Sequence, residues 1–106
     1  MKLTAPLLRV LAVFVDDVSA PRYGYDLMKA ARLPSGTLYP LLARLEHEKL
    51  VVSAWETPQE EGQRPRKYYQ LTGEGIRIAR LELAQASVRR QRAPARTGRP
   101  APGSLG

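Results

Sequence analysis

The sequence predicts a mainly α-helical fold with a β-hairpin wing, a winged helix-turn-helix, and three observations predict it. Residues 23–45 contain two apolar rows with helical spacing, separated by a short Leu-Pro-Ser-Gly turn. Residues 51–71 contain two β-rich runs separated by a polar, partly basic loop. Apolar stretches with helical character flank this arrangement at residues 4–15 and 73–90. We therefore expect four helices and one hairpin.

Length and charge divide the chain into a domain and a tail. The 106 residues fit one domain, which we place at residues 1–92. Residues 93–106 are rich in Arg, Pro, Gly and Ala and have almost nothing to bury, so we expect a disordered tail. The net charge is +7, of which residues 83–106 carry +5 and residues 1–82 only +2. Such a chain permits a nucleic-acid or acidic-membrane partner without establishing either.

The composition argues against several classes of protein. The chain has no cysteine and a single histidine, His47, which excludes disulfides and argues against a transition-metal site. No apolar run approaches the roughly 18 residues that a membrane span needs, so we expect a cytoplasmic protein. No Ser/His/acid set has a credible partner, and Gly73 with Gly75 lacks the surroundings of a dinucleotide-binding motif. We expect neither an enzyme nor a bound cofactor.

The first and last helices carry more apolar surface than one packing face requires. The first, at residues 4–15, has Arg9 as its only polar side chain after a capping Thr4. The last, expected from a capping Thr72 to about Arg90, has two apolar rows. A helix that is apolar nearly all round has to be covered on more than one side. We therefore expect both helices to contact a second copy of the chain. The expected contact residues are Leu7, Leu11, Phe14, Leu81 and Val88.

The third helix, expected from the turn at residues 33–36 to about Glu48, has two contrasting faces. Its core stripe consists of Leu38, Leu41, Leu42 and Leu45. At about 100° per residue, the opposite side carries small side chains and one histidine: Gly36, Pro40, Ala43 and His47. Small residues would let this backbone enter the major groove of DNA, where hydroxyl groups and an arginine can reach bases or phosphates. The alternative is that Ser35 and Thr37 only cap the helix and Tyr39 packs at its edge.

The hairpin is expected at residues 51–56 and 67–71, with residues 57–66 as a flexible tip. We expect Trp55 to anchor the hairpin to the core, the alternative being a ring that stacks on a ligand in a dimer cleft. The tip carries Glu60 and Glu61, which offset part of its positive charge. Residues 34–49 are likewise neutral in sum, so the phosphate contribution to DNA affinity is expected to be modest for each subunit.

Three of these segments resemble the PadR family of bacterial transcriptional regulators. LPSGTLYPLLARLE is similar to the recognition helix of the family, and YGYDLMKA to its second helix. GQRPRKYYQLTGEG is similar to its wing and the start of the following helix. The segments occur in the family's order with family-like gaps, and the resemblance covers about residues 5–90. With a single helix after the wing, the chain resembles the shorter members.

The resemblance implies that the protein binds DNA. It places helix three in the major groove and Tyr25 at a phosphate, with the wing at phosphates or in the minor groove. The helix-three residues implied at or near DNA are Ser35, Thr37, Tyr39, Pro40 and Arg44. The wing residues implied are Arg64, Arg66 and Lys67.

The resemblance also implies a homodimer that represses transcription from a near-palindromic operator. In the family a small-molecule effector or stress signal often releases the DNA, but no residue of this sequence identifies an effector. The alternative reading is a winged-helix module that binds another protein. The acidic wing and the neutral recognition helix favour that alternative, and salt-dependent DNA binding would exclude it.

Overall fold

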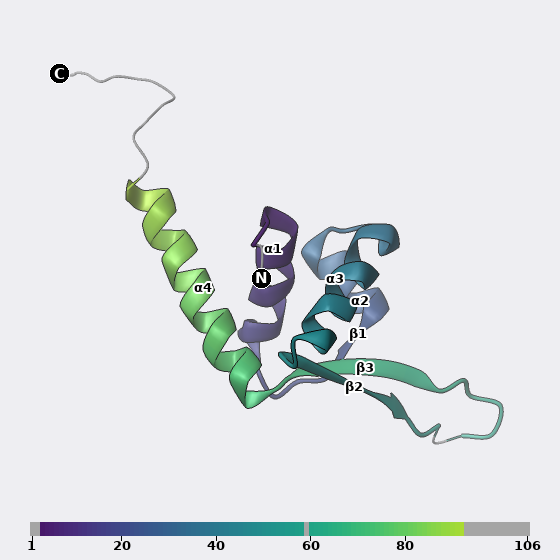
Figure 1. Ribbon diagram of the computed structural model, residues 1–106. Helices are drawn as coiled ribbons and strands as arrows, with labels where there is room; N and C mark the ends of the chain where they lie inside the picture. The colour runs from purple at the N-terminus through teal and green to yellow at the C-terminus, as the bar shows by residue number, and fades with distance from the viewer. Residues whose placement is uncertain (1–2, 59, 93–106) are drawn as a thin grey trace.

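In the part of the chain that it describes, residues 3–58 and 60–92, the computed structural model has four helices and one three-stranded sheet (Figure 1). The tail expected at residues 93–106 lies outside the described residues. The elements are α1 (Ala5–Asp16), β1 (Arg22–Tyr23), α2 (Gly24–Ala31), α3 (Ser35–His47), β2 (Val51–Glu56), β3 (Arg66–Leu71) and α4 (Gly73–Arg92). The mainly helical fold with a hairpin wing is confirmed.

The sheet is antiparallel with the strand order β1-β3-β2. In the hairpin, Val51 pairs with Leu71 beside the helices, and Glu56 pairs with Arg66 at the other end of the strands. This other end is the wing, which projects away from the helices (Figure 1). Strand β3 begins one residue earlier than predicted. The sequence did not predict β1, because two residues cannot show an alternating pattern; β1 exists only because β3 lies beside it.

The core lies between α1, α2, α3 and the helix-facing side of the sheet. The α3 stripe is buried as predicted, with Leu41 partly buried at its edge. The predicted anchoring role of Trp55 is wrong, because its side chain is 66% exposed. The residue lies on the projecting part of β2, outside the buried core. The buried core residues are Leu7, Val10, Leu11, Phe14, Leu27, Ala31, Leu33, Leu38, Leu42, Leu45, Leu50, Val51, Tyr69, Leu71 and Ala79.

The turn between α2 and α3 is closed by an arginine from α1. Arg32 has a φ of 59°, a left-handed conformation that ends α2. The Arg9 guanidinium donates to the carbonyl oxygens of Ala31 at 2.9 Å and Arg32 at 3.3 Å. These carbonyls have no partner within the helix, so Arg9 satisfies them and fixes α1 against the helix-turn-helix. Arg9, the one basic residue of α1, thus has a structural role.

Thr72 begins α4, as predicted. Its hydroxyl accepts a hydrogen bond from the Gly75 N–H at 2.9 Å and donates to the Lys49 carbonyl at 2.9 Å. Its own N–H donates to the Leu50 carbonyl at 3.0 Å. The start of α4 is therefore held to the connection between α3 and β2, and this sets the direction in which α4 leaves the hairpin.

The expectation for the α1 part of a dimer interface has to be corrected. Helix α1 packs against α2, α3 and α4 of its own chain, which accounts for its apolar surface. Leu7, Leu11 and Phe14 are at most 1% exposed within one chain, so they have no surface left to give to a partner. Leu81 and Val88 on α4 are 44% and 46% exposed. None of the described helices is long and apolar enough to span a bilayer.

Candidate nucleic-acid interface

The outward face of α3 consists of small side chains. Opposite the buried leucines, the helix exposes Gly36, Pro40, Ala43 and His47, as the periodicity predicted. The helix continues through Pro40 to His47. Because all but His47 are short, the α3 backbone can approach a grooved partner such as duplex DNA closely.

The α3 residues predicted at DNA lie on this face or at its edges. Ser35, Pro40 and Arg44 are exposed, Tyr39 is 43% exposed, and Thr37 is half-buried. The N-cap of the helix is Pro34, which provides no side-chain cap. Ser35 is therefore the first helical residue and not the cap. Its exposed hydroxyl stands at the positive end of the helix dipole, which suits a phosphate group.

The acidic side chains of the α3 segment point away from this face. Glu46 accepts a hydrogen bond from the Ser53 hydroxyl of β2 at 2.6 Å. Glu48 borders a hollow against α4 on another side of the helix. The neutral sum of residues 34–49 therefore understates the positive character of the exposed face, where Arg44 remains.

Tyr39 lies across the start of α2 and joins the two helices of the motif. A Cβ added at Gly24 would overlap the Tyr39 hydroxyl and stand 3.0 Å from its Cζ atom. Only glycine leaves room for the ring in this position. Gly24 is itself buried, so the contact sets where the exposed edge of the Tyr39 ring lies relative to α2.

An aromatic and basic groove of 380 Å³ continues from Tyr39 onto the wing. It brings Tyr25, Arg66 and Lys67 together with Tyr39, all four of which belong to the predicted DNA-binding set. The sequence contained no sign of a site role for Tyr23, nor of a place for Trp55 in a groove. The full lining is Tyr23, Gly24, Tyr25, Tyr39, Trp55, Arg66, Lys67 and Tyr69. The pairing of β2 with β3 sets Trp55 opposite Lys67, and this register is the signal that could have placed the tryptophan.

Arg66 is held in the groove by an aromatic ring and a carboxylate. Its guanidinium carbon stands 3.7 Å from the centroid of the Tyr23 ring, in cation–π contact. One guanidinium nitrogen is 4.0 Å from the Asp26 carboxylate. The Tyr23 hydroxyl donates to the Glu56 carboxylate at 2.6 Å, and this hydrogen bond raises the pKa of Tyr23. The surroundings of Arg66 therefore include the Asp26 carboxylate and, through Tyr23, that of Glu56.

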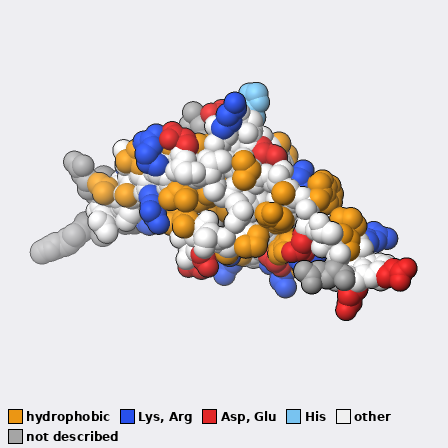
Figure 2. Space-filling view, turned by 90° about the horizontal axis from the view of Figure 1, so that it is seen from below, with side chains coloured by type: hydrophobic (Ala, Val, Ile, Leu, Met, Phe, Trp, Pro, Cys, Tyr) orange, Lys and Arg blue, Asp and Glu red, His pale blue; other side chains and the backbone are white. Residues whose placement is uncertain are grey.

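The rest of the wing carries charges of both signs. The Lys67 ammonium stands 5.9 Å from the Trp55 ring centroid and 5.7 Å from that of Tyr69. Arg64 is exposed in the loop beyond β2 and does not line the groove. Figure 2 shows acidic side chains at the end of the wing, where Glu60 and Glu61 are exposed. The wing cations that share the groove with α3 are thus Arg66 and Lys67, whereas Glu60 and Glu61 lie at the tip.

Among the described residues, no group of three or more His, Asp or Glu side chains could hold a metal ion. The arrangement offers hydroxyl groups, aromatic rings and cations over an open surface. These are groups that bind phosphates and base edges.

A profile of the Transcriptional regulator PadR-like family matches residues 10–81. A PadR family transcriptional regulator from Eggerthella lenta DSM 2243 is 39% identical, with a TM-score of 0.62 over 77% of this chain and 74% of that one. A PadR family regulator from Clostridium difficile R20291 is 32% identical, with a TM-score of 0.58 over 79% and 95%. The smu.1704 protein of Streptococcus mutans UA159 is 26% identical, with a TM-score of 0.71 over 96% and 97%. No curated protein matches the sequence.

Proposed function

The chain belongs to the PadR-like family of transcriptional regulators, and on that basis we propose that it is a homodimeric repressor that reads a near-palindromic operator. Regulators of this family are not enzymes. The observation that carries the proposal is the exposed face of α3. Its side chains are mostly small, and Glu46 and Glu48 point away from it. It continues into the groove that contains Arg66 and Lys67.

In the proposed complex, α3 enters the major groove with its outward face. The short side chains of Gly36, Pro40 and Ala43 allow the close approach, and Arg44 and Tyr39 reach base edges or phosphates. The groove beside α3 takes the phosphate backbone, with Tyr25, Arg66 and Lys67 as donors. Ser35 and Thr37 serve the phosphate at the start of α3, and Arg64 serves a more distant one.

A two-fold dimer would raise the DNA affinity of a chain whose first 82 residues carry little net charge. Residues 1–82 carry a net charge of only +2, so one copy neutralises few phosphates. Two copies double the contacts and present two recognition helices about 34 Å apart, one turn of B-DNA. The exposed Leu81 and Val88 of α4 supply apolar surface for the second copy. Acting on chromosomal DNA, the protein would work in the cytoplasm.

The test is a selection of binding sites from a random DNA pool, comparing the wild type with the double variant Tyr39→Ala, Arg44→Ala. We expect an inverted repeat for the wild type and none for the variant. A Glu61→Ala variant, changed at the wing tip, is the matched control and should select the same repeat. Weak, sequence-blind binding that is equal in all three proteins would refute reading through α3.

A second function has one observation in its favour. The carboxylates of Asp26 and Glu56 beside the groove, with Glu60 and Glu61 at the wing tip, would suit a basic protein partner better than DNA. In that case DNA binding should be weak and should lack the steep salt dependence that phosphate contacts produce. Measuring DNA affinity at several salt concentrations separates the two functions.

A further inference from the structure

The register of the hairpin sets an acid and a base opposite each other at the wing end of the strands. Glu56 of β2 pairs with Arg66 of β3, and both side chains are exposed. Opposite charges at directly opposed positions of two antiparallel strands ordinarily attract each other. In this structure, however, the two side chains do not form an ion pair. Such a pair would offset the charge that Arg66 can offer to DNA, so the cause of their separation bears on binding.

The side chain of Tyr23 contacts both of these charged groups. Its hydroxyl donates to the Glu56 carboxylate at 2.6 Å. The Arg66 guanidinium lies over its ring, with the guanidinium carbon 3.7 Å from the ring centroid. The hydrogen bond raises the pKa of Tyr23, so the hydroxyl keeps its proton at neutral pH and continues to donate. Two different parts of one side chain therefore hold the acid and the base.

Tyr23 is held in this place by its backbone and by a neighbouring ring. It is the second residue of β1, paired with Tyr68 of β3, and it is also the N-cap of α2. The two tyrosine rings meet edge to face, with 6.4 Å between their centroids. Tyr23 is thus fixed to the wing on one side and to the helix-turn-helix on the other. It can therefore hold Arg66 at the groove that the wing shares with Tyr39 of α3.

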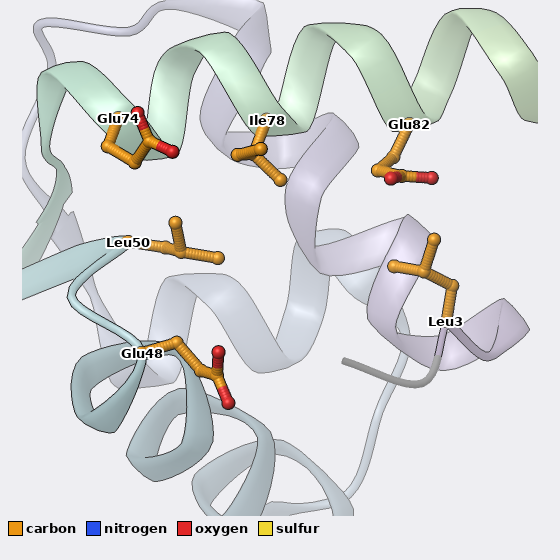
Figure 3. A pocket seen from close by; sticks show the side chains of 6 residues that line it. All are labelled: Leu3, Glu48, Leu50, Glu74, Ile78 and Glu82. Carbon is orange, nitrogen blue, oxygen red and sulfur yellow. The ribbon is translucent and has the colours of Figure 1, made fainter.

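Other carboxylates near the groove leave most of the Arg66 charge available. Glu48, at the end of α3, lines the hollow between α3 and α4 and not the groove (Figure 3). The Asp26 carboxylate is 4.0 Å from one guanidinium nitrogen, and both side chains are more than half exposed. An exposed pair at this distance is weak. Asp26 therefore offsets part of the charge, and Glu56 would offset more of it if Tyr23 released it.

We propose that Tyr23 is a positioning residue for DNA binding, which keeps Glu56 from pairing with Arg66 and leaves the edge of the guanidinium free for a DNA phosphate. The ring covers one face of the planar guanidinium, so the N–H groups at its edge remain to donate. The hydroxyl engages the carboxylate that would otherwise accept from these N–H groups. The inference rests on the DNA binding of the proposed function and adds the residue that keeps one wing cation available.

The test removes the Tyr23 hydroxyl and keeps the ring. In Tyr23→Phe, Glu56 is released to pair with Arg66, so affinity for the selected operator should fall roughly three- to tenfold. The slope of log affinity against log salt concentration should also become flatter, by at most about 0.9 for each subunit. Glu56→Gln added to Tyr23→Phe should restore both, because glutamine has no charge to offset Arg66. Tyr68→Phe removes a hydroxyl from the neighbouring ring and, as the matched control, should bind like the wild type.

The rescue separates positioning from a general structural role. Glu56→Gln removes one negative charge from the wing in any background, so it should raise DNA affinity slightly even in the wild type. If Tyr23 holds this carboxylate, the gain should be several-fold larger in the Tyr23→Phe background. Equal gains in the two backgrounds would overturn the proposal. So would a Tyr23→Phe variant with the affinity and salt dependence of the wild type.

A second measurement needs no DNA. It follows the Arg66 Nε–H signal in NMR spectra of the free protein, assigned by its loss in Arg66→Lys. The Tyr23 ring current should shift this proton upfield in the wild type. The signal should move downfield in Tyr23→Phe, as the guanidinium turns to Glu56, and return when Glu56→Gln is added.

The two measurements fail in different ways. An Arg66 signal that is the same in the wild type and in Tyr23→Phe would overturn the positioning role, even in a protein that binds its operator. A wild type that shows the NMR shifts but binds no DNA would overturn the proposed function and, with it, a phosphate as the partner of Arg66.

Discussion

Replacing Gly75 by alanine is expected to destabilise the protein, although alanine is the better helix former. An added Cβ would overlap the Leu50 carbonyl oxygen and stand 2.8 Å from the Leu50 carbonyl carbon. Both are backbone atoms, so no flexible side chain can move aside. The same carbonyl accepts the hydrogen bond from the Thr72 N–H that holds the start of α4. To make room, α4 has to move away from the connection between α3 and β2.

The size of the effect follows from three contributions. Alanine gains up to about 1 kcal/mol in helix propensity over glycine. Overpacking costs about 1–3 kcal/mol, and weakening the Thr72 hydrogen bond costs roughly 1 kcal/mol. We expect a net loss of about 1–3 kcal/mol in the free energy of unfolding. For a domain of this size, that corresponds to a fall in Tm of roughly 5–20 °C.

Gly73→Ala is the matched control for this prediction. Gly73 lies two residues earlier in the same helix, and an added Cβ would meet nothing within 4 Å. Its variant should be as stable as the wild type or slightly more so. Circular dichroism during heating and urea unfolding of all three proteins gives the comparison. If Gly75→Ala and Gly73→Ala have the same Tm, the close approach to Leu50 does not constrain the fold and the reasoning is refuted.

Three further predictions concern the groove. Gly24→Ala should displace the Tyr39 ring and weaken specific DNA binding tenfold or more. A Gly24→Ala variant with the DNA affinity of the wild type would contradict this. Asp26→Asn should free Arg66 to contact a phosphate. DNA affinity should then rise a few-fold and depend more steeply on salt concentration. An unchanged dependence of affinity on salt would contradict this. Trp55→Ala should change the free energy of unfolding by less than about 0.5 kcal/mol while weakening DNA binding, whereas a large loss of stability would restore the anchoring role.

The sequence was sufficient where a signal is local. The leucine stripe of α3 predicted both its buried side and its small outward face, because helical spacing alone assigns residues to sides. Thr72 predicted the start of α4 because a capping residue acts on N–H groups only a few residues away. Gly75 had no such signal. In the sequence it stood only in an incomplete glycine motif with Gly73. In the structure a glycine is required there because the Leu50 backbone approaches it closely.

Charge and exposure of the candidate site depended on contacts between distant segments. Summed along the sequence, residues 34–49 are neutral, but Glu46 turns to Ser53 and Glu48 turns to α4. A count of charges cannot show this, because it does not say which way a side chain points. Trp55 illustrates the converse, since a large apolar side chain on a strand is usually buried and this one lies outside the buried core.

The amino-acid sequence alone determined the order of the four helices and the hairpin, the sides of α3 and the family, because each rests on spacing within a short window. Only the tertiary structure decided that α1 is covered by its own chain, whereas α4 keeps an uncovered side. Both helices showed the same excess of apolar residues, and periodicity does not say what covers them. That depends on where the hairpin sends α4 relative to α1. The Thr72 contacts with Lys49 and Leu50 fix that direction.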